Sequence, residues 1–200
     1  MLVTLFLGLT AMAQPVVDNA IIPVSVNLNS ILRLNVTSGG NIEFTVNNID
    51  QYTSGIVNSD NYDTKFTVAS SVDFNVLMYA EGGFMGTDGA ATAFDEENVG
   101  YILGMDAAAT GVEAANYDFI TSAGDGLNSN MNLLSTTSTT AIITGIVGAS
   151  AGSTAQNSFI INWELATPEV DAESSLGSLM SQSIVPDRYT TNVFLVLEPQ

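Results

Sequence analysis

The chain contains no histidine and no cysteine among its 200 residues. Disulfide bonds, thiolate nucleophiles, imidazole bases and the common zinc and copper sites are therefore excluded. The chemistry that remains would have to use carboxylates, hydroxyl groups or a single lysine. Because the side chains that most hydrolases and metalloenzymes depend on are missing, the sequence predicts a protein that is not an enzyme.

Basic residues are almost as scarce. Arg33, Lys65 and Arg188 are the three in the chain, against 21 acidic residues, which gives a formal net charge of −18. Nucleic acids bind proteins through Lys and Arg that displace counterions from phosphates, so nucleic acid is excluded as a partner. Charged residues make up only 12% of the chain and hydrophobic residues 46%, so the acidity does not indicate a disordered acidic tail. A surface of amides, hydroxyls and scattered carboxylates is typical of exported bacterial surface proteins.

The chain begins with a short apolar run. Residues 1–13 end in Ala11-Met12-Ala13, the small-x-small pattern of a secretory cleavage site, directly before Gln14. The run is too short to cross a bilayer, which takes about 20 apolar residues. We therefore expect residues 1–13 to be a secretory signal peptide, the protein to be secreted to the cell surface, and the chain to have no membrane span.

Apolar and polar residues alternate with a period of two through much of the remaining chain, clearly so in residues 24–28, 32–36 and 42–46. Further strands are predicted over residues 65–69, 73–80, 141–147, 159–165 and 189–197. Short runs of this kind, separated by loops rich in Gly, Asn, Ser and Thr, predict a single all-β domain over residues 29–200. The expected architecture is an antiparallel β-sandwich of the immunoglobulin-like or pilin-like type, with a closed barrel as the alternative. The glycine pair in residues 37–41 predicts a hairpin turn.

Two residues stand out within this domain. Trp163, the only tryptophan, shares one face of the strand predicted over residues 159–165 with other large apolar side chains, and we expect it to anchor the core. Thr167 is followed by Pro168 and three acidic residues, which is the pattern of a helix N-terminus. The sequence therefore predicts one short helix over residues 168–174, and at most this one.

The N-terminal arm, residues 14–28, differs from the other predicted strands. Its apolar residues are punctuated by Pro15 and Pro23, and proline is confined to edge strands and strand starts because it cannot donate to a ladder. The arm is therefore suited to the edge of a sheet. The last predicted strand, residues 189–197, is apolar on both faces over residues 193–197, which indicates a strand inside a sandwich or beneath a covering element.

The closing strand lies in RYTTNVFLVL, residues 188–197. Together, the arm and this strand resemble the N-terminal arm and the last strand of the β-sandwich subunits of bacterial fimbriae and related surface fibres. The resemblance covers residues 14–36 and 186–198, and it implies that the arm of one subunit completes the sheet of the next by strand addition. The cysteine pair of chaperone-assembled pilins and the lipobox cysteine of another fimbrial type are absent. The implied partner is a second copy of the chain, joined head to tail. The implied polymerisation interface comprises Val16, Val17, Ile21, Ile22, Val24, Val26, Leu28, Val193, Phe194, Leu195, Val196 and Leu197.

Two other arrangements stay open from the sequence. In the first, the N-terminal strand pairs with the last strand of the same molecule, as terminal strands in sandwiches often do. In the second, the chain is a monomeric secreted adhesin or carbohydrate-binding module. A host or surface glycan would then stack on tyrosines near polar loops, namely Tyr52, Tyr62, Tyr101 and Tyr117.

Calcium is the one cofactor for which the sequence offers a site, and it belongs with the binding-module alternative. The segment DGLNSNMN carries carboxylate and amide oxygens, the ligands that calcium prefers, on Asp125, Asn128, Asn130 and Asn132. It lacks the several carboxylates and the terminal Glu of an EF-hand, and turns rich in Asn and Asp are ordinary loop material in β proteins. No other cofactor is expected.

Overall fold

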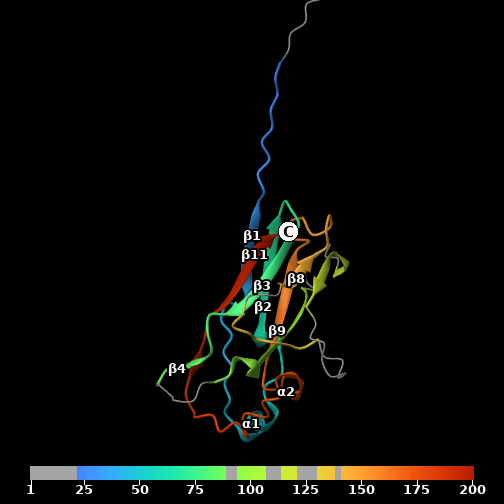
Figure 1. The fold of residues 1–200 in the computed structure, drawn as a ribbon. Helices are drawn as coiled ribbons and strands as arrows, with labels where there is room; N and C mark the ends of the chain where they lie inside the picture. Colours follow the sequence, from blue (N-terminus) through green and yellow to red (C-terminus); the bar gives the residue numbers. More distant parts are fainter. Residues whose placement is uncertain (1–21, 89–93, 107–113, 121–129, 138–140) are drawn as a thin grey trace, which may run out of the picture.

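The computed structural model of the chain describes residues 22–88, 94–106, 114–120, 130–137 and 141–200. Most of the strands in these residues pair antiparallel into two sheets (Figure 1). The first sheet has the order β1 (Leu32–Ser38), β2 (Asp63–Ser70), β9 (Ser158–Leu165), β5 (Val99–Met105) and β7 (Asn132–Leu133). The second has the order β11 (Val193–Pro199), β3 (Phe74–Ala80), β8 (Ala141–Gly145) and β6 (Tyr117–Phe119). A separate ribbon pairs β10 (Tyr189–Thr190) with β4 (Met85–Gly86).

The two sheets bury one hydrophobic core between them. Side chains along β2 and β3 alternate strictly between buried and half-exposed, as the period of two in the sequence requires. The central ring is that of Phe159, which is fully buried and contacts other aromatic rings of both sheets. This arrangement confirms the predicted antiparallel β-sandwich.

Trp163 lies in this core on β9, with 6% of its surface exposed. Its ring centroid is 5.7 Å from that of Tyr101 on β5, and its indole Nε1 donates a hydrogen bond to Thr64 Oγ1 at 2.9 Å. The Thr64 hydroxyl in turn donates to the carbonyl of Gly39 at 2.7 Å. The indole therefore both fills the core and, through Thr64, holds the turn that follows β1.

Two short α-helices lie at one end of the sandwich (Figure 1). The predicted helix is present as α2 (Pro168–Ser174), where the Thr167 hydroxyl accepts from the Val170 N–H. The other, α1 (Ile49–Ser54), is a six-residue segment with no buried residue that the sequence did not indicate. Its six residues show no helical spacing of apolar residues, and the Asn48 side chain caps it by accepting from the Gln51 N–H at 2.9 Å. Single 3-10 turns occur at η1 (Asp60–Tyr62), η2 (Glu96–Asn98) and η3 (Ala114–Asn116).

The two ends of the sandwich can be told apart, and the names used below follow from this. The turn end carries the connection between β2 and β3, residues 71–73, and the start of β1, because Leu32 pairs with Ser70. The helix end carries α1 and α2 (Figure 1). Strand β1 runs from the turn end toward the helix end, and β11 runs the opposite way, because Pro199 pairs with Phe74. No helix in the described parts of the chain is long and apolar enough to cross a membrane.

Two of the predicted strands are not paired in the structure. Residues 24–28 and 42–46 are extended, yet within the described residues neither joins a sheet. The predicted hairpin turn is also wrong. Gly39 does make a turn, with φ +65°, and a Cβ there would lie 1.8 Å from the carbonyl oxygen of Asp63. However, the chain continues toward the helix end instead of returning along β1, and the described strand that pairs with β1 is β2.

Asp73 forms a group of hydrogen bonds at the turn end of the second sheet. Its carboxylate accepts hydrogen bonds from the Gly148, Ser150 and Ala151 N–H groups and from the Ser150 hydroxyl, at 2.5 to 3.3 Å. These bonds, the one from Gly148 first and the Ser150 hydroxyl second, lower the pKa of Asp73 below its ordinary value of 3.8. The carboxylate therefore joins the start of β3 to the loop after β8.

We expect the Asp73→Asn variant to lose the part of the stability that depends on this ionised group. A carboxyl whose pKa is lower in the folded protein stabilises the fold at pH above its unfolded value, and this contribution disappears as pH falls through the folded pKa. The difference in urea midpoint between the parent chain and the variant should be largest above about pH 4 and shrink below it. A difference that does not change between pH 7 and pH 2.5 would contradict this role.

Candidate functional site

The described part of the arm, residues 22–28, projects from the turn end as an extended chain (Figure 1). Its even-numbered residues are apolar and almost fully exposed: Ile22 81%, Val24 84%, Val26 76% and Leu28 91%. The odd-numbered residues are Pro23, Ser25 and Asn27, so one face is apolar and the other largely polar. Residues 22–31 carry no charge. An apolar strand face this exposed is unusual on a monomeric domain.

The root of the arm is fixed to the sandwich. The Ile31 N–H donates to Ser71 Oγ at 2.8 Å, and the Ser71 N–H donates to the Ile31 carbonyl at 2.9 Å. From Leu32 onward the chain is β1, so the arm continues the line of this strand beyond the sandwich (Figure 1). The direction of the arm is therefore set by β1.

Strand β11 is an outer strand of the second sheet. It pairs with β3 over its whole length, and no described strand pairs with its other side. Leu195 and Leu197 pack against the core but stay half-exposed. On the opposite face, Phe194 is 41% exposed, and its ring lies 5.4 Å from that of Tyr79. The second apolar face of this strand, which the sequence predicted to be covered, is thus partly open among the described residues.

The outer strands of the two sheets, β1 and β11, lie next to each other on one side of the sandwich. We call this side the open edge. Besides these two strands it includes residues 41–46, which continue from β1 toward the helix end. The half-buried apolar residues at the open edge are Leu32, Leu34, Ile42, Phe44, Val46, Leu195 and Leu197.

Pairing of the first strand with the last within one molecule is absent from the described residues. Strand β1 pairs with β2, and β11 pairs with β3, in different sheets. Residues Val16, Val17 and Ile21 of the predicted interface lie outside the described residues. The structure therefore brings β1 and β11 together at the open edge but leaves the described part of the arm away from both.

The predicted calcium segment is only partly described. Asp125 and Asn128 lie outside the described residues. The side chain of Asn132 is buried in β7, and its Nδ2 donates to the carbonyls of Ile120 and Asn130 at 3.2 and 3.0 Å. The Asn132 amide group thus joins β7 to neighbouring backbone. Among the residues that the structure describes, no group of three or more acidic side chains could hold a metal ion.

The loop tyrosines that could have stacked on a glycan do not form an exposed platform. Tyr101 and Tyr117 are buried, and burial raises the pKa of each phenol to about 12. The Tyr117 hydroxyl donates a hydrogen bond to Asn157 Oδ1. Tyr52 and Tyr62 are half-buried against the core. Their positions are those of packing residues, which the sequence could not distinguish from surface residues.

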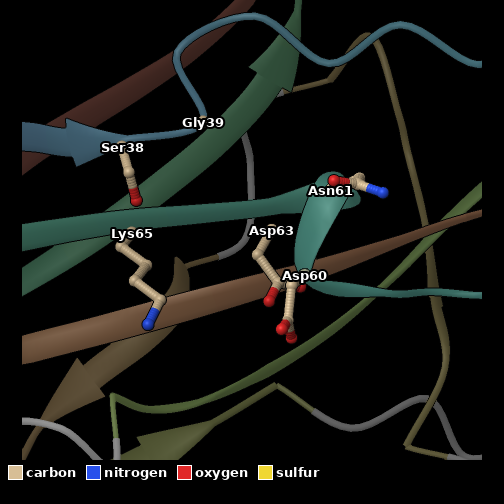
Figure 2. A pocket seen from close by; sticks show the side chains of 6 residues that line it. All are labelled: Ser38, Gly39, Asp60, Asn61, Asp63 and Lys65. Atoms are coloured by element: carbon tan, nitrogen blue, oxygen red, sulfur yellow. The ribbon is translucent and has the colours of Figure 1, made fainter.

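A polar hollow of about 510 Å³ lies beside the start of β2, lined by Ser38, Gly39, Asp60, Asn61, Asp63 and Lys65 (Figure 2). Two of its charged side chains, Lys65 and Asp63, contact residues of neighbouring strands or the loops beside them. Lys65 Nζ lies 3.2 Å from the Asp106 carboxylate just after β5, and Asp63 accepts from the Asn162 amide on β9. Two of the charged side chains that line the hollow therefore join strands of the first sheet.

Comparison of the chain with models of known protein families and with curated protein sequences finds no match.

Proposed function

We propose that the chain is a structural, non-catalytic subunit of an extracellular bacterial filament or surface fibre. In this proposal the arm of one copy adds as a strand to the open edge of the next copy. One observation carries it, namely that an extended segment with an almost fully exposed apolar face projects from a sandwich whose outer strands β1 and β11 are each unpaired on one side among the described residues. Export of the subunit follows from the predicted signal peptide in residues 1–13.

The energetic argument rests on the four exposed apolar side chains of the arm. Burying a Val, Leu or Ile side chain contributes about 1.5–3 kcal/mol, and none of this is realised while the arm stands in water. At the open edge, the half-exposed leucines of β1 and β11 leave further apolar surface uncovered. Contact between the arm of one copy and the open edge of the next would bury both of these apolar surfaces.

Strand β11 is suited to receive another strand because it has few of the features that usually block pairing at an edge strand. Monomeric proteins usually blunt edge strands with lysine, proline or a bulge. Strand β11 has no basic residue, its ladder with β3 shows no bulge, and its only proline is Pro199 at the end. Strand β1 carries Arg33 and has a register shift near its end. Of the two outer strands at the open edge, β11 is therefore the one without features that block pairing.

Such an association would be open-ended. The arm and the receiving edge are different surfaces of the same molecule, so each added copy presents a new arm. Contacts of this type form filaments unless the rotation between copies closes a ring. Residues 22–31, which comprise the described part of the arm and its root, are uncharged, as are the apolar residues of the open edge. This limits repulsion between molecules with a net charge of −18.

Deletion of residues 14–24 tests the proposal. Because the deletion stops short of Ile31, the contacts at Ser71 and the whole sandwich remain. We expect a folded monomer that forms no filaments in electron micrographs and elutes at monomer size at every concentration, whereas the parent chain polymerises. Filaments of normal length from the deletion variant would contradict the proposal. A parent chain that stays monomeric and melts at a calcium-dependent temperature would support the binding-module alternative instead.

A further inference from the structure

We infer that residues 41–46 are a strand position left open within each molecule, and that residues 22–28 of a second copy are the strand that pairs with it. The inference depends on the proposed function, and it identifies the backbone that receives the described part of the arm. It also explains why a segment with a clear strand pattern is unpaired.

Residues 41–46 already have the properties of an edge strand. Their side chains alternate, with Ile42, Phe44 and Val46 packed against the core and the residues between them exposed. The ring of Phe44 stacks on that of Tyr62 with centroids 4.5 Å apart. Within the described residues, however, the backbone N–H and C=O groups of 41–46 make no hydrogen bond. Backbone polar groups of a strand are normally satisfied by a neighbour, so one side of this segment is free for a partner.

The segment is held extended from both ends without that partner. Before it, the Gly39 carbonyl accepts from the Thr64 hydroxyl at 2.7 Å. After it, the Asn47 N–H donates to Gln51 Oε1 at 2.8 Å, and Asn48 caps α1. In the middle, Glu43 Oε1 lies 3.3 Å from Arg188 Nη2. A receiving strand that is already ordered lowers the conformational entropy lost when the partner binds.

The described part of the arm matches this segment in its pattern. Both are extended, both carry their apolar residues at even-numbered positions, and both carry mainly polar residues between them. If the arm pairs beside residues 41–46, its apolar side chains would therefore face the core, on the same face as Ile42, Phe44 and Val46. The arm adds no charge beside Glu43, because residues 22–28 are uncharged.

The reach of the arm favours residues 41–46 over β11 as its partner. The arm leaves the molecule at the turn end, opposite the helix end (Figure 1). In copies stacked in one orientation, the arm of one copy would therefore meet the helix end of the next. Only residues 29 and 30 lie between Leu28 and the anchored Ile31, and the span from Leu28 to Ile31 is about 10 Å at ~3.3 Å per residue. The stretch of the receiving copy nearest its helix end is residues 41–46, about 20 Å long. Strand β11 begins beyond this stretch, with Val193 opposite Ala80, and would be reached by the part of the arm that precedes Ile22.

The polarity of the pairing follows from the same geometry. In two copies stacked in one orientation, the arm runs in the direction of β1, and so do residues 41–46, which continue from β1. The new ladder is therefore parallel, which is common in mixed sheets. The register with most apolar contact places Val24 opposite Ile42, Val26 opposite Phe44 and Leu28 opposite Val46.

Cysteine cross-linking tests both the partner and the polarity. Since the chain has no cysteine, each single-cysteine variant carries one thiol. Polymers of mixed Ser25→Cys and Glu43→Cys chains, and of mixed Asn27→Cys and Thr45→Cys chains, should form disulfide-linked dimers on mild oxidation, identified by mass spectrometry. The Glu43 variant loses only an exposed ion pair, so the fold should be retained. A mixture of Glu43→Cys with a Ser25→Cys chain that also lacks residues 14–24 is the control and should not cross-link.

Matched variants on β11, Phe194→Cys and Val196→Cys, separate the outcomes. Mixed with the arm variants, they should give less than a tenth of the cross-linked product seen for positions 43 and 45. Polymers that cross-link only through β11, or through neither segment, would overturn this inference and leave the proposed function standing. Cross-links from Ser25 to Thr45 together with Asn27 to Glu43 would indicate antiparallel pairing and overturn the stated polarity. A parent chain that never polymerises would overturn both proposals.

Discussion

Replacing Val24 and Val26 together with aspartate is expected to abolish filament formation while leaving the sandwich folded. Both side chains are more than three-quarters exposed in the single molecule, so the fold does not depend on them. In the proposed contact both are buried. Losing two valines removes about 3–6 kcal/mol of apolar burial, and desolvating the carboxylates costs several kcal/mol more. Because every 1.4 kcal/mol is a factor of ten, the association constant should fall at least about a hundredfold.

The matched control is the Asn27→Asp, Asn29→Asp double variant. It adds the same two negative charges, at Asn27 near the end of the arm and at Asn29 just after it, but on the polar face. If burial of the apolar face drives assembly, this control should polymerise at nearly the parental critical concentration, measured by sedimentation or light scattering. Equal loss of polymer in the two double variants would show that net charge, and not the apolar face, controls assembly.

Replacing Phe159 with alanine is expected to cause the largest loss of stability of any single change considered. The side chain is fully buried, and its ring lies 5.0 to 6.4 Å from those of Phe66, Phe74, Tyr117 and Phe119. Because these rings come from strands of both sheets, the surroundings cannot collapse into the cavity without moving one sheet relative to the other. Truncating such a buried phenylalanine costs about 3–5 kcal/mol.

Phe194→Ala is the comparison for this measurement. Phe194 is also an aromatic strand residue, but it is 41% exposed and contacts one ring, that of Tyr79. We expect it to cost about 1 kcal/mol. Urea unfolding of both variants, made in the chain lacking residues 14–24 so that assembly does not contribute, gives the two values directly. Similar urea midpoints for the two variants would contradict the central place of Phe159.

The period of two in the sequence was enough to predict the strands with a buried face. It placed β2, β3 and β9 to within two residues and indicated Trp163 as a core residue, because alternation records which face of a strand is covered. The cap at Thr167 with Pro168 after it predicted α2, because both residues act locally.

The pairing of the strands could not be predicted in the same way. Residues 42–46 alternate as clearly as β1 does, but whether a strand has a neighbour depends on segments far away in the sequence. The single run predicted at residues 189–197 is divided in the structure into β10 and β11, which pair with different strands. Helix α1 was missed because its cap at Asn48 is not followed by an apolar repeat. The open edge itself therefore became visible only in three dimensions.

The anchoring of Ile31 at Ser71 has a mechanical consequence for a fibre built from such units. A pull along the fibre would enter each sandwich through this clamp and pass straight into β1, whose ladder to β2 is antiparallel and aligned with the arm. Force in this direction loads the rungs of the ladder simultaneously, in shear, and does not open them one after another. A thread of these molecules should therefore resist tension far better than a sideways load that unzips the same two strands.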